Sequence, residues 1–152
     1  MKFTYIVFSL IISLIIVLQA CEKEGENETK ISSFNSKKSH NMGQNCMNCH
    51  KDGGEGEGWF QLAGTIYDSL KVNTNPNTTV NLFTGPNGTG TLKYTLQVDG
   101  LGNFYTTAAA DFATGLYPAV VGKNSTKYMS SITTSGQCNS CHGVTTDKIY
   151  AN

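Results

Sequence analysis

The chain has 152 residues, with eleven lysines, no arginine and eleven acidic residues, so its formal net charge is zero. A neutral chain without a basic stripe argues against nucleic acid as a partner. Its length allows one domain with a modest core. No nucleophile paired with a base, no paired carboxylates and no phosphate-binding loop stand out, so we expect neither an enzyme nor a small-molecule substrate.

Residues 1–20 have the pattern of a signal peptide. Lys2 precedes an apolar run over residues 3–18, which is short for a membrane span and typical of a signal-peptide core. The following Leu18-Gln19-Ala20-Cys21 resembles the lipobox of bacterial lipoproteins, in which the cysteine becomes the lipidated first residue. This resemblance implies lipidation of Cys21 and a bacterial cell envelope protein, anchored in the outer membrane and facing the periplasm or the cell surface. The alternative is an ordinary secretory signal that leaves Cys21 as a free thiol.

Residues 21–39 are predicted to form a flexible tether. They contain only two sizeable apolar residues, Ile31 and Phe34, which is too few to offset the entropy lost on ordering. The acidic cluster over residues 22–28 resembles an export tag of surface lipoproteins, although a solvated linker has the same composition.

Two pentapeptides carry the most specific signal in the sequence: Cys46-Met47-Asn48-Cys49-His50 and Cys138-Asn139-Ser140-Cys141-His142. C-x-x-C-H is the attachment pattern of c-type haem. The two thiols bind the haem vinyl groups, and the adjoining imidazole reaches the iron as the proximal ligand. We therefore predict two covalently attached haem groups, in haem-binding segments at 40–58 and 123–152.

Other chemistries can also use C-x-x-C pairs. Four thiolates can hold a structural zinc, but such modules usually keep their pairs close together, and zinc does not require a histidine after each pair. Two local disulfides or thioredoxin-type redox pairs are the third interpretation, although no βαβ pattern accompanies them.

The sixth ligand of each predicted iron comes from a short list of residues. His40 is the only histidine outside the two motifs, and it is our candidate distal ligand for either haem, with Met42 as its rival. Met129 is the candidate distal ligand for the second haem. If neither bound, an open iron position would favour ligand binding or catalysis over plain electron transfer.

The glycine-rich acidic run at 51–58 is predicted to be a flexible hinge that leads into a β region at 59–122. Turn residues in this region separate short segments with strand patterns, at 59–67, 79–83, 92–98, 103–106 and 116–121. Pro118 predicts that the last strand is an edge. No helical period competes, so we expect a mainly β fold: a small sandwich flanked by two irregular or short-helical haem-binding segments.

The order of these cues resembles the carboxypeptidase-regulatory-like, or transthyretin-like, β-sandwich. Its motifs look like Gly64-Thr65-Ile66-Tyr67-Asp68, Val80-Asn81-Leu82, Asp99-Gly100-Leu101-Gly102-Asn103-Phe104 and Gly115-Leu116-Tyr117. The resemblance implies a Greek-key sandwich that serves as a structural or adhesive module without catalytic residues.

Together, the two motifs and the lipobox resemble small dihaem c-type cytochrome lipoproteins. This resemblance implies an electron-transfer protein that meets redox partner proteins in the envelope and reaches the membrane through Cys21. Two alternatives remain: a small haem enzyme or ligand sensor, and a binding or adhesion lipoprotein whose aromatic side chains grip a glycan or a protein. Among these aromatics, Trp59 is the one expected to touch a porphyrin, because it follows the first motif closely.

Overall fold

The computed structural model describes residues 28–152. The predicted signal peptide, Cys21 and most of the acidic cluster lie outside the described residues. None of the helices within residues 28–152 is long and apolar enough to cross a membrane.

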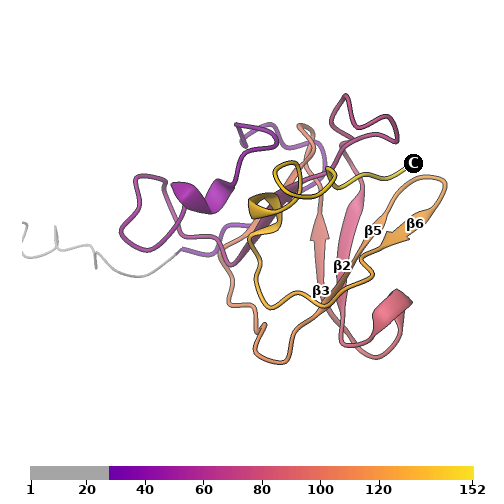
Figure 1. Ribbon diagram of the computed structural model, residues 1–152. Helices are drawn as coiled ribbons and strands as arrows, with labels where there is room; N and C mark the ends of the chain where they lie inside the picture. The colour runs from indigo at the N-terminus through magenta and orange to yellow at the C-terminus, as the bar shows by residue number, and fades with distance from the viewer. Residues whose placement is uncertain (1–27) are drawn as a thin grey trace, which may run out of the picture.

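The described chain is mainly β, as predicted, and its strands form two antiparallel sheets (Figure 1). The smaller sheet pairs β1 (Leu62–Thr65) with β4 (Asn103–Thr106). The larger sheet has the order β3-β2-β5-β6, from β3 (Leu92–Gln97) through β2 (Thr79–Phe83) and β5 (Tyr117–Val121) to β6 (Thr126–Tyr128). The helical elements in this part of the chain are three single 3-10 turns: η1 (Cys46–Asn48), η2 (Pro86–Gly88) and η3 (Cys138–Ser140).

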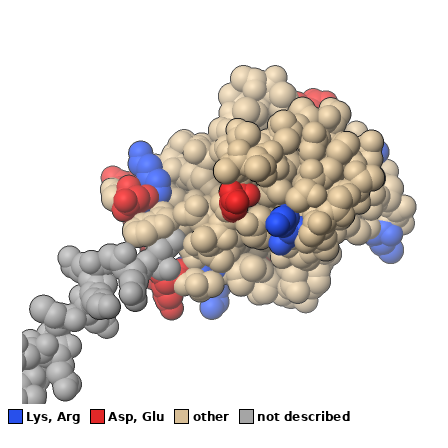
Figure 2. All heavy atoms as spheres, turned by 90° about the horizontal axis from the view of Figure 1, so that it is seen from below, with Lys and Arg blue, Asp and Glu red and all other residues tan. Residues whose placement is uncertain are grey.

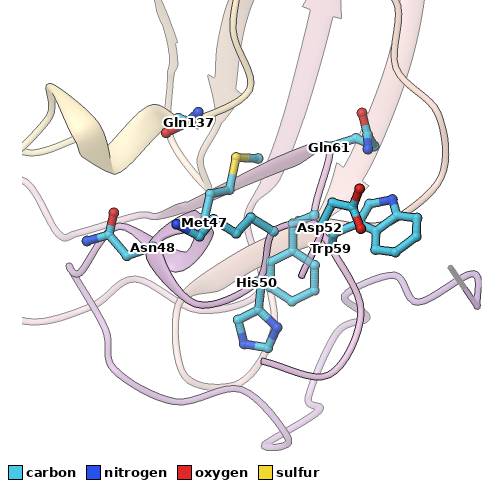
Figure 3. A pocket seen from close by; sticks show the side chains of 9 residues that line it. Met47, Asn48, His50, Asp52, Trp59, Gln61 and Gln137 are labelled. Carbon is cyan, nitrogen blue, oxygen red and sulfur yellow. The ribbon is translucent and has the colours of Figure 1, made fainter. Parts of the chain in front are cut away.

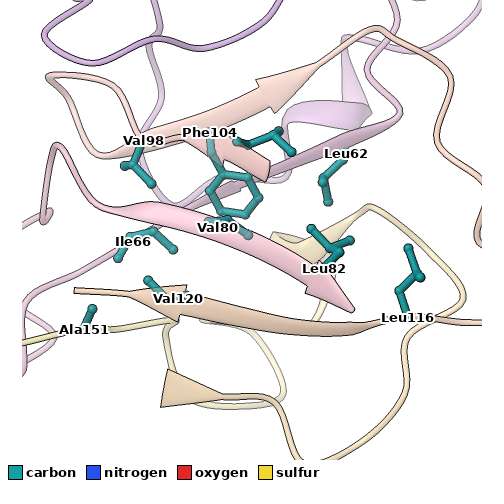
Figure 4. Close-up of a cluster of buried hydrophobic side chains, with 10 residues drawn as sticks. Leu62, Ile66, Val80, Leu82, Val98, Phe104, Leu116, Val120 and Ala151 are labelled. Atoms are coloured by element: carbon teal, nitrogen blue, oxygen red, sulfur yellow. The ribbon is translucent and has the colours of Figure 1, made fainter. Parts of the chain in front are cut away.

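The core lies between the two sheets. Val80 and Leu82 alternate with half-buried residues along β2, so one face of that strand points inward, as period-two patterning requires. Leu62 and Phe104 from the smaller sheet face them (Figure 4). The remaining members of this buried cluster are Ile66, Leu96, Val98, Leu116, Val120 and Ala151.

The expected edge position of Pro118 is wrong. β5 lies between β2 and β6, and Pro118 pairs with Leu82 of β2. In an antiparallel strand the nitrogen and the carbonyl of one residue face the same neighbour. The Pro118 carbonyl accepts from the backbone N–H of Met129, which follows the last residue of β6. The Pro118 nitrogen, which has no hydrogen to donate, therefore faces a position beyond the end of β6. The three residues of β6 show no apolar alternation from which a strand could be predicted.

Residues 28–36, expected to belong to a flexible tether, instead run along the smaller sheet. Ile31 forms a bridge with Thr106 of β4, and the Ser32 N–H donates to the Tyr105 carbonyl at 3.0 Å. Ser32 is buried, and its hydroxyl reaches the Gln97 carbonyl at 2.6 Å. Backbone pairing with an open sheet edge thus orders a polar segment that apolar content alone does not predict.

The other edge of the smaller sheet receives the segment before the second motif. Gln137 forms a parallel bridge with Ala63 of β1, and the Ala63 N–H donates to the Gly136 carbonyl at 2.9 Å. The approach is close, because a side chain at Gly136 would overlap the Gln61 carbonyl. Strand β1 contacts both η3 and η1, so the smaller sheet supports the two motif turns, which lie near each other in Figure 1.

Candidate functional site

The first cysteine motif folds as one tight turn. The Cys46 carbonyl accepts the N–H groups of Cys49 at 3.3 Å and His50 at 2.9 Å, and the Asn45 side chain caps the Met47 N–H at 3.2 Å. Cys46 is half-buried, with its thiol 3.7 Å from the Gln44 carbonyl, while Cys49 is exposed. Burial raises the pKa of the Cys46 thiol.

The second motif repeats this geometry. The Cys138 carbonyl accepts the N–H groups of Cys141 at 3.3 Å and His142 at 3.0 Å. Cys138 lies inward, with its thiol 3.6 Å from the Gly136 carbonyl, and Cys141 is exposed. Two stretches from opposite ends of the described chain therefore present their cysteines and histidine in the same local arrangement.

Both motif histidines are held by a ring nitrogen that faces a main-chain carbonyl. His50 Nδ1 lies 3.2 Å from each of the Glu57 and Gly58 carbonyl oxygens, and His142 Nδ1 lies 2.8 Å from the Asp147 carbonyl oxygen. A carbonyl oxygen only accepts, so Nδ1 is the donor in each ring, and in the neutral tautomer with that proton the lone pair is on Nε2. This arrangement is the usual one for a metal-ligating histidine.

The glycine-rich run folds over His50 and is not an open hinge. The Gly56 N–H donates to the Cys49 carbonyl at 3.0 Å, and the Phe60 N–H returns to the His50 carbonyl at 2.9 Å. A Cβ atom at Gly56 would lie 2.7 Å from His50 Nδ1, closer than side-chain carbons approach ring atoms. The imidazole occupies that space, which explains the need for glycine there.

A stack of rings fixes the plane of the first imidazole. Phe60 lies face to face with His50, with ring centroids 4.2 Å apart and an angle of 8° between planes, and Tyr105 stacks on the other side of Phe60 at 4.8 Å. Burial is the main cause of a raised pKa at Tyr105. The residue stacked on His50 is thus Phe60, whereas Trp59 lines a neighbouring cavity of about 780 Å³ with Met47 and His50 (Figure 3).

His40, the candidate distal ligand, lies beside the first motif. Its ring centroid is 5.7 Å from that of His50, with 38° between planes. Two imidazoles that bind one metal from opposite sides, each through a metal–nitrogen bond of about 2 Å, place their centroids about 6 Å apart. Both rings line a cavity of about 1110 Å³ together with Cys46 and Cys49. The residues at the first motif therefore fit a haem group.

The two motifs meet in space. The Asn45 amide donates to the Gln137 side-chain oxygen at 3.4 Å, across 92 positions of the chain, so the residues that precede the two turns contact each other. The Asn139 amide, inside the second motif, donates to the Gln44 carbonyl at 3.0 Å. Burial raises the pKa of the Cys138 thiol to about 12, and the nearby Cys46 adds to the shift.

Thr65 at the end of β1 links both motifs to the smaller sheet. Its hydroxyl accepts from the Gly43 N–H at 2.9 Å and from the Asn139 amide at 3.0 Å, and it donates to the Asn103 side chain at 2.7 Å. The Thr65 N–H donates to the Asn139 side-chain oxygen at 3.2 Å. Sequence reasoning missed Asn139 and Thr65. The signal that could have found Asn139 is its position: an amide directly follows the first cysteine of the second motif, where the first motif has methionine.

Met129, the candidate distal ligand of the second haem, is half-buried after β6 and is held through its N–H by Pro118. No hydrogen bond or ring contact in the part of the chain that the structure describes joins it to His142. Cys21, the predicted lipidation site, lies outside the described residues.

The four motif cysteines are free thiols. Within residues 28–152, no group of three or more His, Cys, Asp or Glu side chains is arranged to hold a metal ion. The thiols thus do not gather into the tetrahedral set of a structural zinc site.

No protein-family model, curated protein or solved structure matches the chain.

Proposed function

We propose that this chain is a dihaem c-type cytochrome that transfers electrons in the bacterial cell envelope. One observation carries the proposal. Two C-x-x-C-H turns of the same geometry lie side by side, and each holds its histidine through Nδ1 on a main-chain carbonyl. This arrangement leaves Nε2 of His50 and His142 free to ligate iron.

In this proposal each cysteine pair would hold one haem through thioether bonds. Haem iron supplies one-electron redox chemistry, whose potential depends on the axial ligands and their hydrogen bonds. His50 and His142 would be the proximal ligands. His40, which lines the 1110 Å³ cavity together with His50, is the distal candidate at the first centre, and Met129 remains the candidate at the second.

The contact between the two motifs supports electron exchange between the centres. Asn45 and Asn139 tie the first turn to the second, and both turns rest on the smaller sheet. A rigid platform under both centres keeps their separation fixed, as a site built on regular elements requires. The two haems would then act as one relay and need not serve separate partners.

The remaining parts of the proposal concern the scaffold and the location. The β region would be a Greek-key, transthyretin-like sandwich that serves as a platform without catalytic residues. Lipidated Cys21 would anchor the protein to the membrane, which several acyl chains make stable. The face in Figure 2 carries scattered lysine and acidic side chains of both signs among uncharged residues. Redox partner proteins would thus meet the cytochrome by co-location in the membrane more than by long-range steering.

The test compares optical and electron paramagnetic resonance spectra of three proteins produced with the cytochrome c maturation machinery: wild type, His40→Ala and Met129→Ala. Two low-spin haems in the wild type support electron transfer, and His40→Ala should convert the first centre to high spin. Met129→Ala tests the second centre in the same way. A high-spin wild-type centre that binds carbon monoxide would contradict plain electron transfer and favour a haem enzyme or ligand sensor.

A further inference from the structure

One residue whose main-chain carbonyl contacts His50 also forms an ion pair through its side chain. Glu57 accepts from His50 Nδ1 with its main-chain oxygen, and its carboxylate lies 2.5 Å from the Lys30 ammonium. Lys30 comes from the segment along β4, where its backbone exchanges hydrogen bonds with Thr107 at 2.7 and 2.9 Å. A second carboxylate, that of Glu28, lies 3.8 Å from the same ammonium.

The second site repeats this arrangement with different residues. Asp147 accepts from His142 Nδ1 with its main-chain oxygen, and its carboxylate lies 2.6 Å from the Lys71 ammonium. Lys71 belongs to the loop between β1 and β2, and Lys148 donates to its carbonyl at 3.1 Å. The Lys71 ammonium also lies 4.9 Å from the ring centroid of Tyr150.

In each ion pair the lysine side chain is more buried than the carboxylate. The two lysine side chains are 27% and 32% exposed, whereas the side chains of Glu57 and Asp147 are 86% and 79% exposed. Hydrogen bonds from the lysines hold the pKa of both carboxyls below their usual values. In each site, therefore, one acidic residue joins the histidine to a lysine from a distant segment.

We propose that Lys30 and Lys71 are positioning residues, each of which holds a main-chain carbonyl against Nδ1 of one axial histidine and thereby lowers the reduction potential of that haem. The inference rests on the proposed function. A hydrogen bond from Nδ1 to a fixed acceptor raises the basicity of Nε2. A more basic ligand stabilises oxidised iron, so each lysine–carboxylate pair sets the donor strength of its own histidine. We call these two ion pairs, Lys30–Glu57 and Lys71–Asp147, the histidine latches.

The charges of a latch also act on the iron directly, and this effect must be separated from positioning. Removing a lysine alone lowers the potential through lost positive charge, and removing a carboxylate alone raises it. The double variants Lys71→Leu/Asp147→Asn and Lys30→Leu/Glu57→Gln keep the net charge of the wild type while they remove the latch. A pure charge effect therefore nearly cancels in them, while a positioning effect remains.

The experiment uses the holoprotein and measures two quantities for each haem: its midpoint potential, and the hydrogen-exchange rate of the Nδ1 proton in the reduced state by nuclear magnetic resonance. Each double variant should raise the potential of its own centre and accelerate exchange of its own histidine several-fold, while the other centre stays unchanged and so reports on the fold. Lys71→Arg, which keeps the ion pair, should behave as wild type. Lys93→Leu removes an exposed charge on β3 and should leave exchange at both histidines unchanged.

Wild-type potentials and exchange rates in both double variants would overturn the positioning role while leaving the dihaem assignment intact. A wild-type protein without covalent haem would instead overturn the proposed function and the inference with it. Haem content is therefore measured first, on the same preparation.

Discussion

Asn139→Ala is the substitution that most directly tests how the two motifs are joined. Asn139 is 3% exposed, and its side chain makes three hydrogen bonds: it accepts from the Thr65 N–H and donates to the Thr65 hydroxyl and to the Gln44 carbonyl. Alanine fits the same backbone but makes none of them. The substitution thus separates the second motif from both β1 and the first motif.

The cost can be estimated from these contacts. Thr65 is 1% exposed, so its N–H would lose its partner away from water, at a cost of about 1–3 kcal/mol. The hydroxyl bond contributes about 1 kcal/mol more. Gln44 is exposed, and water can replace the donor to its carbonyl at little cost. We therefore expect Asn139→Ala to lower the free energy of unfolding by about 2–4 kcal/mol.

The assay is equilibrium denaturation of the holoprotein, followed by far-ultraviolet circular dichroism and haem absorbance. Ser140→Ala is the matched control, because Ser140 is the neighbouring residue of the same motif, is exposed and makes one side-chain bond to a carbonyl, to Gln137 at 2.6 Å. It should cost about 1 kcal/mol or less. If Asn139→Ala proved as mild as this control, the network around Thr65 would not be what holds the two motifs together.

Three further predictions concern single residues. Gly56→Ala should displace the His50 ring, because the added carbon would lie 2.7 Å from Nδ1. In the electron paramagnetic resonance spectrum the g-values of the first haem should change while those of the second do not. An unchanged spectrum would contradict the described loop. The Asp147 pKa is lowered by its lysine partner, so its contribution to stability is fully present above about pH 4, the usual Asp pKa, and is lost as pH falls from there through the lower pKa of the folded state. The stability difference between wild type and Asp147→Asn should therefore shrink on acidification, and a difference independent of pH would refute the pairing. In the chain without haem, brief alkylation at neutral pH should label exposed Cys141 before half-buried Cys138, whose pKa is raised to about 12. Equal labelling of the two thiols by mass spectrometry would contradict this difference in environment.

Local patterns were enough to predict much of the sheet. The strand at 79–83 has alternating side chains bounded by turn residues, and the strand at 103–106 follows an Asp-Gly turn, so both predictions match β2 and β4 at their ends. The 3-10 turns at the motifs are likewise local, because their hydrogen bonds close within the pentapeptides. Such features depend on neighbours in the chain, and the sequence displays them directly.

The long-range contacts could not be predicted in this way. Nothing in the composition of residues 28–36 indicates that an open edge of β4 will order them. The neighbourhood of Pro118 depends on a three-residue strand without an apolar pattern. Most of the candidate site also depends on long-range contacts. The motif residues can be recognised in the sequence, but the contact through Asn139 and the ion pairs of Lys30 and Lys71 form only when distant segments meet.

The central claim is that each C-x-x-C-H turn carries one covalent haem, and intact mass spectrometry tests it most directly. The protein is produced with the cytochrome c maturation machinery as wild type, as Cys46→Ala/Cys49→Ala and as Cys138→Ala/Cys141→Ala, and is unfolded in acid before measurement to release any haem that is not covalently bound. We predict a mass increase of two haem groups for the wild type and of one for each double variant. A wild type without added haem mass, or double variants that both keep two haems, would contradict the account.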